Sequence, residues 1–437
     1  MEEQNTGTLP APPVRAETLP ARANFDIAAM HTHTAGYAVL NWLCDYPQRE
    51  CLMQLFRRFW PILRVPFVGL VIVFRDEDVR EVLAHDREFP VPWRGRMLQL
   101  SRGKNFMLGM ENGPEYRRNY GQLARAFRRE DVATYVVPQT AKACAEILSG
   151  KRQIDAVRDL IWHVPSQLCE DYYGIEIPDK QRFAEWTVVM SRYLFGSWSD
   201  KVDTRSMDLA MTAADCFRTV IRSAIEKARL GHARGVVLPR LIAMQKSDRE
   251  LTNDVLEAHL FGMVTGFIPT NVLAGGYMLS TLLGRDDFMA QARAAALDEN
   301  DDLLWRCLQE ALRFRNINLG PFRICGPPGG YTLAAGTSRA KHIAKGTGLL
   351  ASAQSAMFDD RRIATPRKFD PKRGAEDYLV FGYGQHFCLG ALIAIAQITH
   401  TLKALLQKPG LRRAPGNAGR LQMISVFPAH LSVAFDQ

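Results

Sequence analysis

A cysteine follows a glycine-rich stretch near the C-terminal end of the chain, in the run FGYGQHFCLGALIAIAQITHTLKALL that begins at Phe381. Gly382, Gly384 and Gly390 permit tight backbone turns and the close approach of a flat ligand. The apolar periodicity after Cys388 predicts an amphipathic helix, whose N–H groups and dipole would stabilise a thiolate there. A thiolate that accepts backbone hydrogen bonds is a good iron ligand. These residues therefore predict an iron site at Cys388.

The same stretch resembles the signature of the cytochrome P450 haem-thiolate family, F-G-x-G-x-H-x-C-x-G around the cysteine that binds iron. The matching positions are Phe381, Gly382, Gly384, His386, Cys388 and Gly390. The alternative interpretation is a free core cysteine after a glycine-rich turn. The resemblance implies haem b as the cofactor, with Cys388 as its axial ligand. By position, His386 and Arg323 would donate to the haem propionates, since charge-assisted donors to carboxylates are the stronger kind.

Glu310 and Arg313 form an E-x-x-R pair on a predicted helix, where residues three apart share a face and can form an ion pair. In the P450 family, such a pair lies beneath the haem loop and joins a basic residue from the segment before that loop. Here the segment reads TPRKFDPKR, and the usual arginine position is Lys368. The resemblance implies a structural cluster of these three residues, although lysine lacks the planar fork of arginine.

One predicted helix departs from the pattern of bacterial P450s. The stretch ENGPEYRRNYGQLARAF (111–127) resembles the helix whose basic residues meet a haem propionate. Tyr116 and Tyr120 occupy the positions where histidine and arginine usually donate. The resemblance therefore suggests Arg117 or Arg118 as substitutes, and ordinary packing is the expected role of the two tyrosines.

The stretch TGFIPTN (265–271) lies in the middle of a predicted helix of roughly 30 residues, about 45 Å long. Thr252, Asn253 and Asp254 are candidate N-caps, and Gly284 is a stop signal. A proline in this helix has no N–H for the carbonyl four residues earlier, and its ring crowds that turn. The helix is expected to bend or open there.

By resemblance, this helix covers the distal face of the haem, where the usual motif is a small residue, Gly, any residue, an acid, Thr, Thr. Here Ile268 replaces the acid and Pro269 replaces the first threonine. In ordinary monooxygenases those two side chains organise water and deliver protons to the reacting dioxygen. Isoleucine and proline cannot donate a proton. The candidate catalytic residues are Thr265, Gly266, Ile268, Pro269, Thr270 and Asn271.

Three functions remain open on these grounds. The first is a haem-thiolate enzyme that uses or rearranges a peroxide (a lipid hydroperoxide, an endoperoxide or hydrogen peroxide), because a peroxide already contains the reduced O–O bond. The alternative is an O2-dependent monooxygenase in which Thr265, Thr270, Asn271 or the substrate organises the proton-delivering water. The third is a haem-binding sensor without turnover. The substrate of either enzyme would be a hydrophobic small molecule, such as a fatty-acid derivative.

Basic residues flank the segments expected on the proximal side of the haem, where an acidic ferredoxin-type protein would dock. They are Arg117, Arg118, Arg125, Arg128, Arg129, Arg361, Arg362, Lys372 and Arg373. Solvated surface charge is the alternative explanation. The formal net charge of +9 does not itself indicate nucleic acid, since no basic stripe with interleaved aromatic residues is present.

The rest of the chain predicts the scaffold of this site. With 47% hydrophobic and 23% charged residues, it has the composition of a globular protein, and its eight cysteines form no C-x-x-C pair. Helical patterns dominate, with short strands near 66–75 and in the 320s to 350s. We expect a mainly α fold with a small β region (α+β), of the single-domain P450 type, over residues 26–437. We also expect a flexible arm at 1–25, no membrane span and a cytoplasmic location.

Overall fold

The computed structural model describes residues 27–30, 48–197, 199 and 204–436, so the predicted arm at 1–25 lies outside the described residues. The helices of seven or more residues are α2 (Gln48–Phe59), α3 (Asp76–Ala84), α4 (Arg94–Leu100), α5 (Pro114–Ala126), α6 (Val137–Leu148), α7 (His163–Asp171), α8 (Lys180–Phe195), α9 (Thr204–Arg229), α10 (Val237–Met244), α11 (Asn253–Leu282), α12 (Asp286–Leu297), α13 (Asp301–Phe314) and α15 (Ala391–Leu406). A short helix, α14, covers Ala353–Ala356. The mainly α prediction is confirmed.

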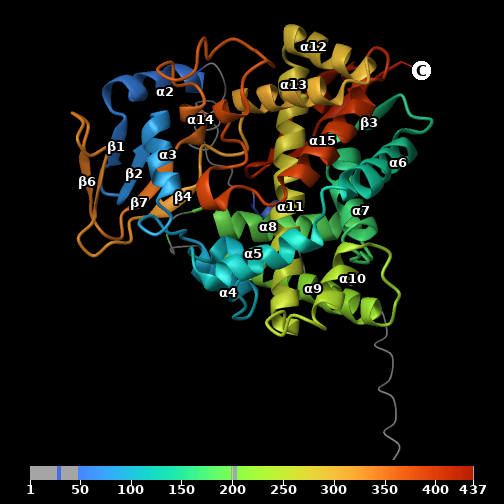
Figure 1. The fold of residues 1–437 in the computed structure, drawn as a ribbon. Helices are drawn as coiled ribbons and strands as arrows, with labels where there is room; N and C mark the ends of the chain where they lie inside the picture. The colour runs from blue at the N-terminus through green and yellow to red at the C-terminus, as the bar shows by residue number, and fades with distance from the viewer. Residues whose placement is uncertain (1–26, 31–47, 198, 200–203, 437) are drawn as a thin grey trace, which may run out of the picture.

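A four-stranded sheet has the order β1-β2-β7-β4. Its strands are β1 (Ile62–Val65), β2 (Leu70–Val73), β7 (Gly348–Ala351) and β4 (Phe322–Ile324). Strand β2 pairs in parallel with β7, and the other two pairings are antiparallel. The expected strands near 66–75 and in the 320s to 350s therefore lie side by side. Figure 1 shows this sheet with α2 and α3 on one side of the molecule and most helices on the other.

Smaller sheets join distant parts of the chain. A three-stranded sheet has the order β3-β11-β8, and two hairpins pair β5 with β6 and β9 with β10. Their bounds are β3 (Gln153–Asp155), β5 (Tyr331–Leu333), β6 (Lys341–Ile343), β8 (Arg412–Arg413), β9 (Gln422–Ile424), β10 (Phe427–His430) and β11 (Ser432–Ala434). Because these strands have only two to four residues, they give little periodic signal, and β3 and β8 to β11 were not predicted.

Helix α11 runs through the middle of the helical region (Figure 1) and is 30 residues long, as its apolar pattern predicts. Thr252 is its N-cap, and the Thr252 hydroxyl accepts a hydrogen bond from the N–H of Val255 at 3.3 Å. Apolar residues occur on all faces of the helix, so it is buried along most of its length. Pro269 lies inside α11, which continues on both sides of it, so the expected opening does not interrupt the helix.

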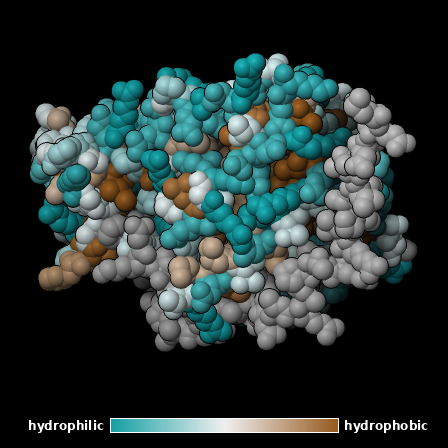
Figure 2. All heavy atoms as spheres, turned by 90° about the horizontal axis from the view of Figure 1, so that it is seen from below, coloured by the Kyte–Doolittle hydropathy of each residue, from teal (hydrophilic) through white to brown (hydrophobic). Residues whose placement is uncertain are grey.

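The face of the molecule in Figure 2 is polar for the most part. Seen from below the view of Figure 1, hydrophilic residues dominate and hydrophobic atoms form separate patches (Figure 2). Within the described ranges, no helix combines the length and the apolar character needed to cross a bilayer.

Candidate active site

The loop that carries Cys388 folds back on itself before α15. Gly382 and Gly384 have φ angles of +81° and +69°, which favour glycine. A Cβ on Gly384 would also lie 2.7 Å from the carbonyl oxygen of Leu83, so α3 packs directly against the loop. The N–H of Cys388 donates to the carbonyl of Phe381 at 3.0 Å. The glycines of the motif thus allow the turn that presents the cysteine.

Cys388 is partly buried and lies just before α15. Gly390 is the N-cap of this helix, which begins at Ala391, three residues after the cysteine. Burial raises the pKa of the Cys388 thiol, and a hydrogen bond from the Gly390 backbone N–H opposes that rise. A bound metal ion would displace the thiol proton, and its positive charge would stabilise the thiolate in these partly buried surroundings.

The buried Arg323 and the partly buried His386 are two basic side chains at this loop. Among the described residues, His386 Nδ1 and Arg323 Nε have no hydrogen-bond partner. Burial, reinforced by the charge of Arg323, lowers the pKa of His386 to about 4, and burial lowers that of Arg323 to about 10. Unmatched buried donors are costly, so both residues are suited to hold an anionic group.

Helix α5 presents tyrosine, not arginine, to the loop. The Tyr116 hydroxyl donates to the carbonyl of Gln385 at 2.8 Å, and the Tyr116 ring lies edge-on to His386 at 5.9 Å. Arg117 and Arg118 follow Tyr116 on the exposed side of the helix. Arg117 donates to the Asn112 side chain and Arg118 lies 3.6 Å from the carboxylate of Glu250, so their role at the propionates stays a prediction.

The centre of α11 contains a turn with open space beside it. A Cβ on Gly266 would meet no atom within 4 Å in the described part of the chain. Thr270 follows four residues later on the same face, and its hydroxyl donates to the Gly266 carbonyl at 2.5 Å. Both residues are partly exposed, whereas Ile268 and Pro269 are buried. Gly266 and Thr270 therefore line the open space.

Two buried polar atoms of this turn lack partners. The hydroxyl of Thr265 and the side-chain oxygen of Asn271 form no hydrogen bond with any described residue. The side-chain amide of Asn271 donates to the Phe267 carbonyl at 2.7 Å. Pro269 also offers no N–H to the carbonyl of Thr265. Residue 265 thus provides a hydroxyl and a carbonyl that a water molecule or a ligand could satisfy.

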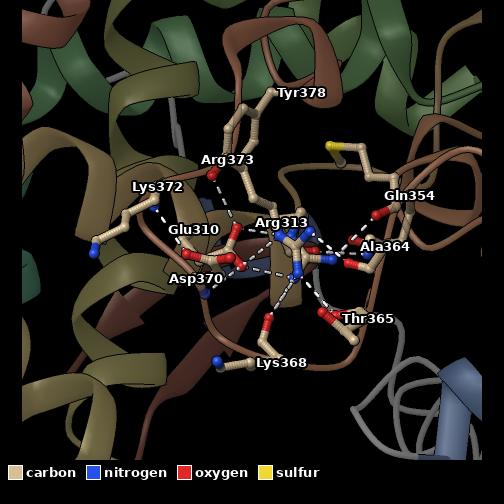
Figure 3. Close-up of polar contacts among 11 residues, drawn as sticks. Glu310, Arg313, Gln354, Ala364, Thr365, Lys368, Asp370, Lys372, Arg373 and Tyr378 are labelled. Carbon is tan, nitrogen blue, oxygen red and sulfur yellow. Dashed lines mark hydrogen bonds and ion pairs between the residues drawn. The ribbon is translucent and has the colours of Figure 1, made fainter.

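The predicted ion pair on α13 is fully buried (Figure 3). Both side chains have 0% exposure, and Arg313 donates from Nε and Nη2 to the two carboxylate oxygens of Glu310, each at 2.7 Å. The Tyr378 hydroxyl donates to Glu310 Oε2 at 3.0 Å. This bidentate geometry makes the pair a structural element beneath the loop.

The third member of this cluster is Arg373, and the expectation for Lys368 is corrected. Arg373 Nε donates to Glu310 Oε1 at 3.2 Å. The Lys368 side chain is exposed, and only its carbonyl takes part, as an acceptor from Arg313 and Arg373 (Figure 3). Burial leaves Arg373 out of the predicted docking surface. The sequence signal was available, because arginine is the cation best suited to buried pairs with carboxylates.

Sequence reasoning also missed two contacts of α11. A Cβ on Gly262 would lie 2.2 Å from the Phe106 ring, so this aromatic side chain packs directly on the helix backbone. One turn earlier, His259 Nε2 lies 2.9 Å from Gln122 Oε1 of α5. A single histidine and one of four glycines in an apolar helix did not indicate which residues they would contact.

Residues 40–419 match the family model described as Cytochrome P450. The chain belongs to the cytochrome P450 family. This P450 is 24% identical over 393 residues to the cyclomarin C epoxidase of Salinispora arenicola. The alignment covers 87% of this chain and 91% of the epoxidase. This P450 is 27% identical over 357 residues to the mycinamicin VIII C21 methyl hydroxylase of Micromonospora griseorubida, over 78% and 84% of the two chains.

Solved structures share the fold of this P450. The ligand-free structure of cytochrome P450 TbtJ1 superimposes with a TM-score of 0.72 at 22% identity, over 93% of this chain and all of that one. Cytochrome CYP109E1 of Bacillus megaterium, solved in complex with testosterone, gives a TM-score of 0.73 at 20% identity, over 89% and 97% of the two chains.

Members of the family bind haem b, and the residues of this P450 fit that group. Cys388 offers a sulfur ligand for the iron, and the absence of a side chain at Gly390 allows the haem to approach the loop closely. Arg323 and His386 have the unpartnered buried atoms that two propionates would satisfy. Open space at Gly266 leaves room on the side of α11.

Proposed function

We propose that this P450 is an O2-dependent monooxygenase that acts on a hydrophobic small molecule. In this reaction, substrate, dioxygen, two electrons and two protons give a product with one added oxygen atom, plus water. The printed names of relatives, which include an epoxidase, a hydroxylase and a steroid C26-monooxygenase, support this proposal. They give no support to the peroxide chemistry that the residues at 268 and 269 suggested. The monooxygenase, which was the alternative hypothesis, is therefore favoured over the peroxide-using enzyme.

The observation that carries the proposal is the pair of hydroxyl groups at the α11 turn. Thr270 commits its hydrogen to the Gly266 carbonyl, which leaves its oxygen lone pairs for a water molecule in the open space. The Thr265 hydroxyl is buried and without a partner among the described residues. These groups can hold a water that delivers protons although neither an acid nor a threonine occupies 268 and 269.

The other residues of the site bind and position the cofactor in this proposal. Haem, when bound, supplies the redox chemistry that activates dioxygen. Cys388 would hold the iron through its sulfur, and His386 and Arg323 would hold the propionates. Glu310, Arg313 and Arg373 fix the loop from below. The buried faces of α11 keep bulk water from the reacting atoms.

The electrons would come from an acidic ferredoxin-type protein. The exposed basic residues that could receive it are Arg117, Arg118, Arg125, Arg128, Arg129, Arg361, Arg362 and Lys372. Several of these charges have acidic neighbours, including Arg125 with Asp248 and Arg361 with Asp359. Steering of the partner would therefore depend on the sum of the charges and weaken with salt.

Oxygen-isotope labelling tests the proposal. The haem protein is mixed with ¹⁸O2, NAD(P)H, a surrogate ferredoxin system and apolar probes such as testosterone and hexadecanoic acid. Product that carries one ¹⁸O atom is expected. A parallel mixture contains hydrogen peroxide or a fatty-acid hydroperoxide without reductant. Rapid turnover only in that mixture would establish the peroxide hypothesis instead, and absence of turnover in both would favour a haem-binding sensor.

A further inference from the structure

A buried histidine lies one helical turn before Gly262 on α11. His259 has 0% exposure, and its Nε2 is 2.9 Å from Gln122 Oε1. Gln122 lies on α5, and its side-chain nitrogen is 3.1 Å from Asp248 Oδ2. Asp248 lies in the loop after α10 and is also 3.2 Å from Arg125. A chain of hydrogen bonds therefore connects the inside of α11 to an ionisable group near the surface.

This chain fixes which nitrogen of His259 carries the proton. The hydrogen bond from Gln122 lowers the pKa of Asp248, so the carboxylate is ionised at neutral pH and only accepts. The amide nitrogen of Gln122 must therefore face Asp248, and its oxygen must face His259. His259 Nε2 is then the donor, and Nδ1 carries the lone pair. Burial lowers the pKa of His259 to about 4, which keeps the ring neutral.

The acceptor nitrogen has nothing to accept from. Among the described residues, no group donates to His259 Nδ1, although the atom is fully buried. A buried polar atom without a partner costs free energy, and an apolar residue in this position would avoid that cost. The charged group that acts on the His259 ring is the carboxylate of Asp248, and it is not a cation.

His259 lies on the same stripe of α11 as the open space. Residues 259, 262, 266 and 270 are separated by three or four positions, so they share one helix face. Phe106 covers the first part of this stripe: its ring is 6.2 Å from the His259 ring at an interplanar angle of 78°, and it packs on Gly262. The stripe thus begins at the buried His259, passes under the Phe106 ring at Gly262, and ends at the partly exposed Thr270.

We propose that His259 Nδ1 is a substrate-positioning acceptor, which binds a hydroxyl or N–H group of an otherwise apolar substrate. Gln122 and Asp248 are the positioning residues that keep Nδ1 unprotonated and fix the ring. The inference rests on the proposed monooxygenase function for the identity of the ligand as a substrate. It selects substrates that carry a hydrogen-bond donor at a distance from the carbon that reacts, because His259 and Gly266 are seven residues apart, about 10 Å along the helix.

Spectral titration of the haem protein with matched probes tests the inference without turnover. The probes are three rigid skeletons (adamantane, bornane and androstane), each as the hydrocarbon, the alcohol and the ketone. The alcohol donates a hydrogen bond, whereas the ketone only accepts. We expect the wild-type protein to bind at least one alcohol about 10-fold more tightly than its ketone, the ratio that one net hydrogen bond of about 1.4 kcal/mol provides.

Two variants of His259 separate the acceptor from the rest of the ring. His259→Gln keeps a donor for Gln122 and removes the acceptor at the Nδ1 position, so the preference for the alcohol should disappear. His259→Asn keeps an acceptor near the Nδ1 position and loses the contact with Gln122, so part of the preference should remain. In ¹⁵N-histidine spectra of the wild type, the Nδ1 resonance of His259 should move when the alcohol binds and stay in place with the ketone.

The outcomes are separable from those of the isotope experiment. A wild-type protein that binds no alcohol, or binds alcohols and ketones equally, would overturn the role of His259 even if ¹⁸O enters a product. An unchanged preference in His259→Gln would do the same. The two experiments can also give different answers. If only His259→Gln loses the preference for the alcohol, but the wild-type protein does not use dioxygen, the binding site stands and the proposed reaction is rejected.

Discussion

Arg373 Nε lies 3.2 Å from Glu310 Oε1, in a cluster where Lys368 contributes only its backbone carbonyl. Arg373→Ala leaves the Glu310–Arg313 pair in place but removes the donors to Glu310 Oε1 and to the carbonyls of Thr365 and Lys368. Because these buried acceptors lose a partner, the variant should lower the free energy of unfolding by about 1 to 3 kcal/mol and reduce haem loading. Lys368→Ala should change it by less than about 0.5 kcal/mol, as exposed substitutions usually do.

Denaturant unfolding and haem content of the two variants check this prediction. Arg373→Lys is the matched control, because it keeps the charge and loses the planar fork, so an intermediate loss is expected. Equal stability of Arg373→Ala and Lys368→Ala would contradict the assignment.

The Glu310 cluster also illustrates what sequence can and cannot predict. The helix and its E-x-x-R pair follow from a local pattern with a three-residue spacing, whereas the structural role of the pair was implied by the family resemblance. The partner comes from a loop with no periodicity, so the pattern does not show whether Lys368 or Arg373 turns inward, and the preference of arginine for buried carboxylates was the available signal. The long apolar helix α11 was also predictable from a local pattern, because its helical spacing of apolar residues is repeated over 30 residues.

Contacts between distant segments account for most of what sequence did not provide. Tyr116, His259 and Gly262 each acquire a role only when α5, α11 and the segment at Phe106 are packed together. The exposure of Arg117 and Arg118 likewise depends on the rotation of α5, since a shift of one residue moves a side chain by about 100° around a helix.

Cys388→Ser should remove the sulfur ligand that holds the iron. Electron donation from a thiolate assists O–O bond cleavage, so the variant should lose both turnover and the thiolate-type Soret band of the reduced carbon monoxide complex. Cys51→Ser is the control, because Cys51 is exposed on α2 and its loss should leave both signals unchanged. A Cys388→Ser protein that kept its spectrum and its activity would exclude Cys388 as the ligand.

Acid should destabilise the protein partly through His259. Its pKa is about 4 in the folded protein against 6.5 for the free side chain, so below pH 6.5 the unfolded chain binds more protons. Stability is therefore complete above pH 6.5 and falls as the pH drops toward 4, by about 3 kcal/mol for this residue. Asp248, whose pKa is lowered, is a second group in the same network, and its contribution is lost at lower pH as it becomes protonated.

Urea unfolding from pH 7 to pH 4 measures this effect. His259→Gln cannot take up the proton and keeps a donor for Gln122, so its stability should fall less steeply than that of the wild type over this range. His85→Gln is the control, because His85 is exposed at the end of α3 and its replacement should leave the slope unchanged. Parallel curves for wild type and His259→Gln would mean that the buried histidine does not resist protonation.

Pro269→Thr should increase dioxygen use relative to peroxide use. The change supplies an N–H to the carbonyl of Thr265 and a hydroxyl at the position where the family motif has one. A positioned proton donor contributes about 10² to 10⁴ in rate, so product from the ferredoxin-driven reaction should rise by up to about 10²-fold over product from hydrogen peroxide. Ile268→Asp is a poorer test alone, since Ile268 has 0% exposure and a carboxylate there would be desolvated.

Hydroxyl deletions provide the opposite arm of that test. Thr265→Val and Thr270→Val should lower the same ratio if these hydroxyls hold the proton-delivering water. Thr281→Val, near the far end of α11, is a matched control that should leave it unchanged. The double variant Ile268→Asp with Pro269→Thr restores the whole motif and should raise the ratio further where it folds, which haem content reports. If Pro269→Thr and Thr270→Val both leave the ratio at its wild-type value, the turn at 265–271 is only a structural variation of α11, and proton delivery must use groups on another element.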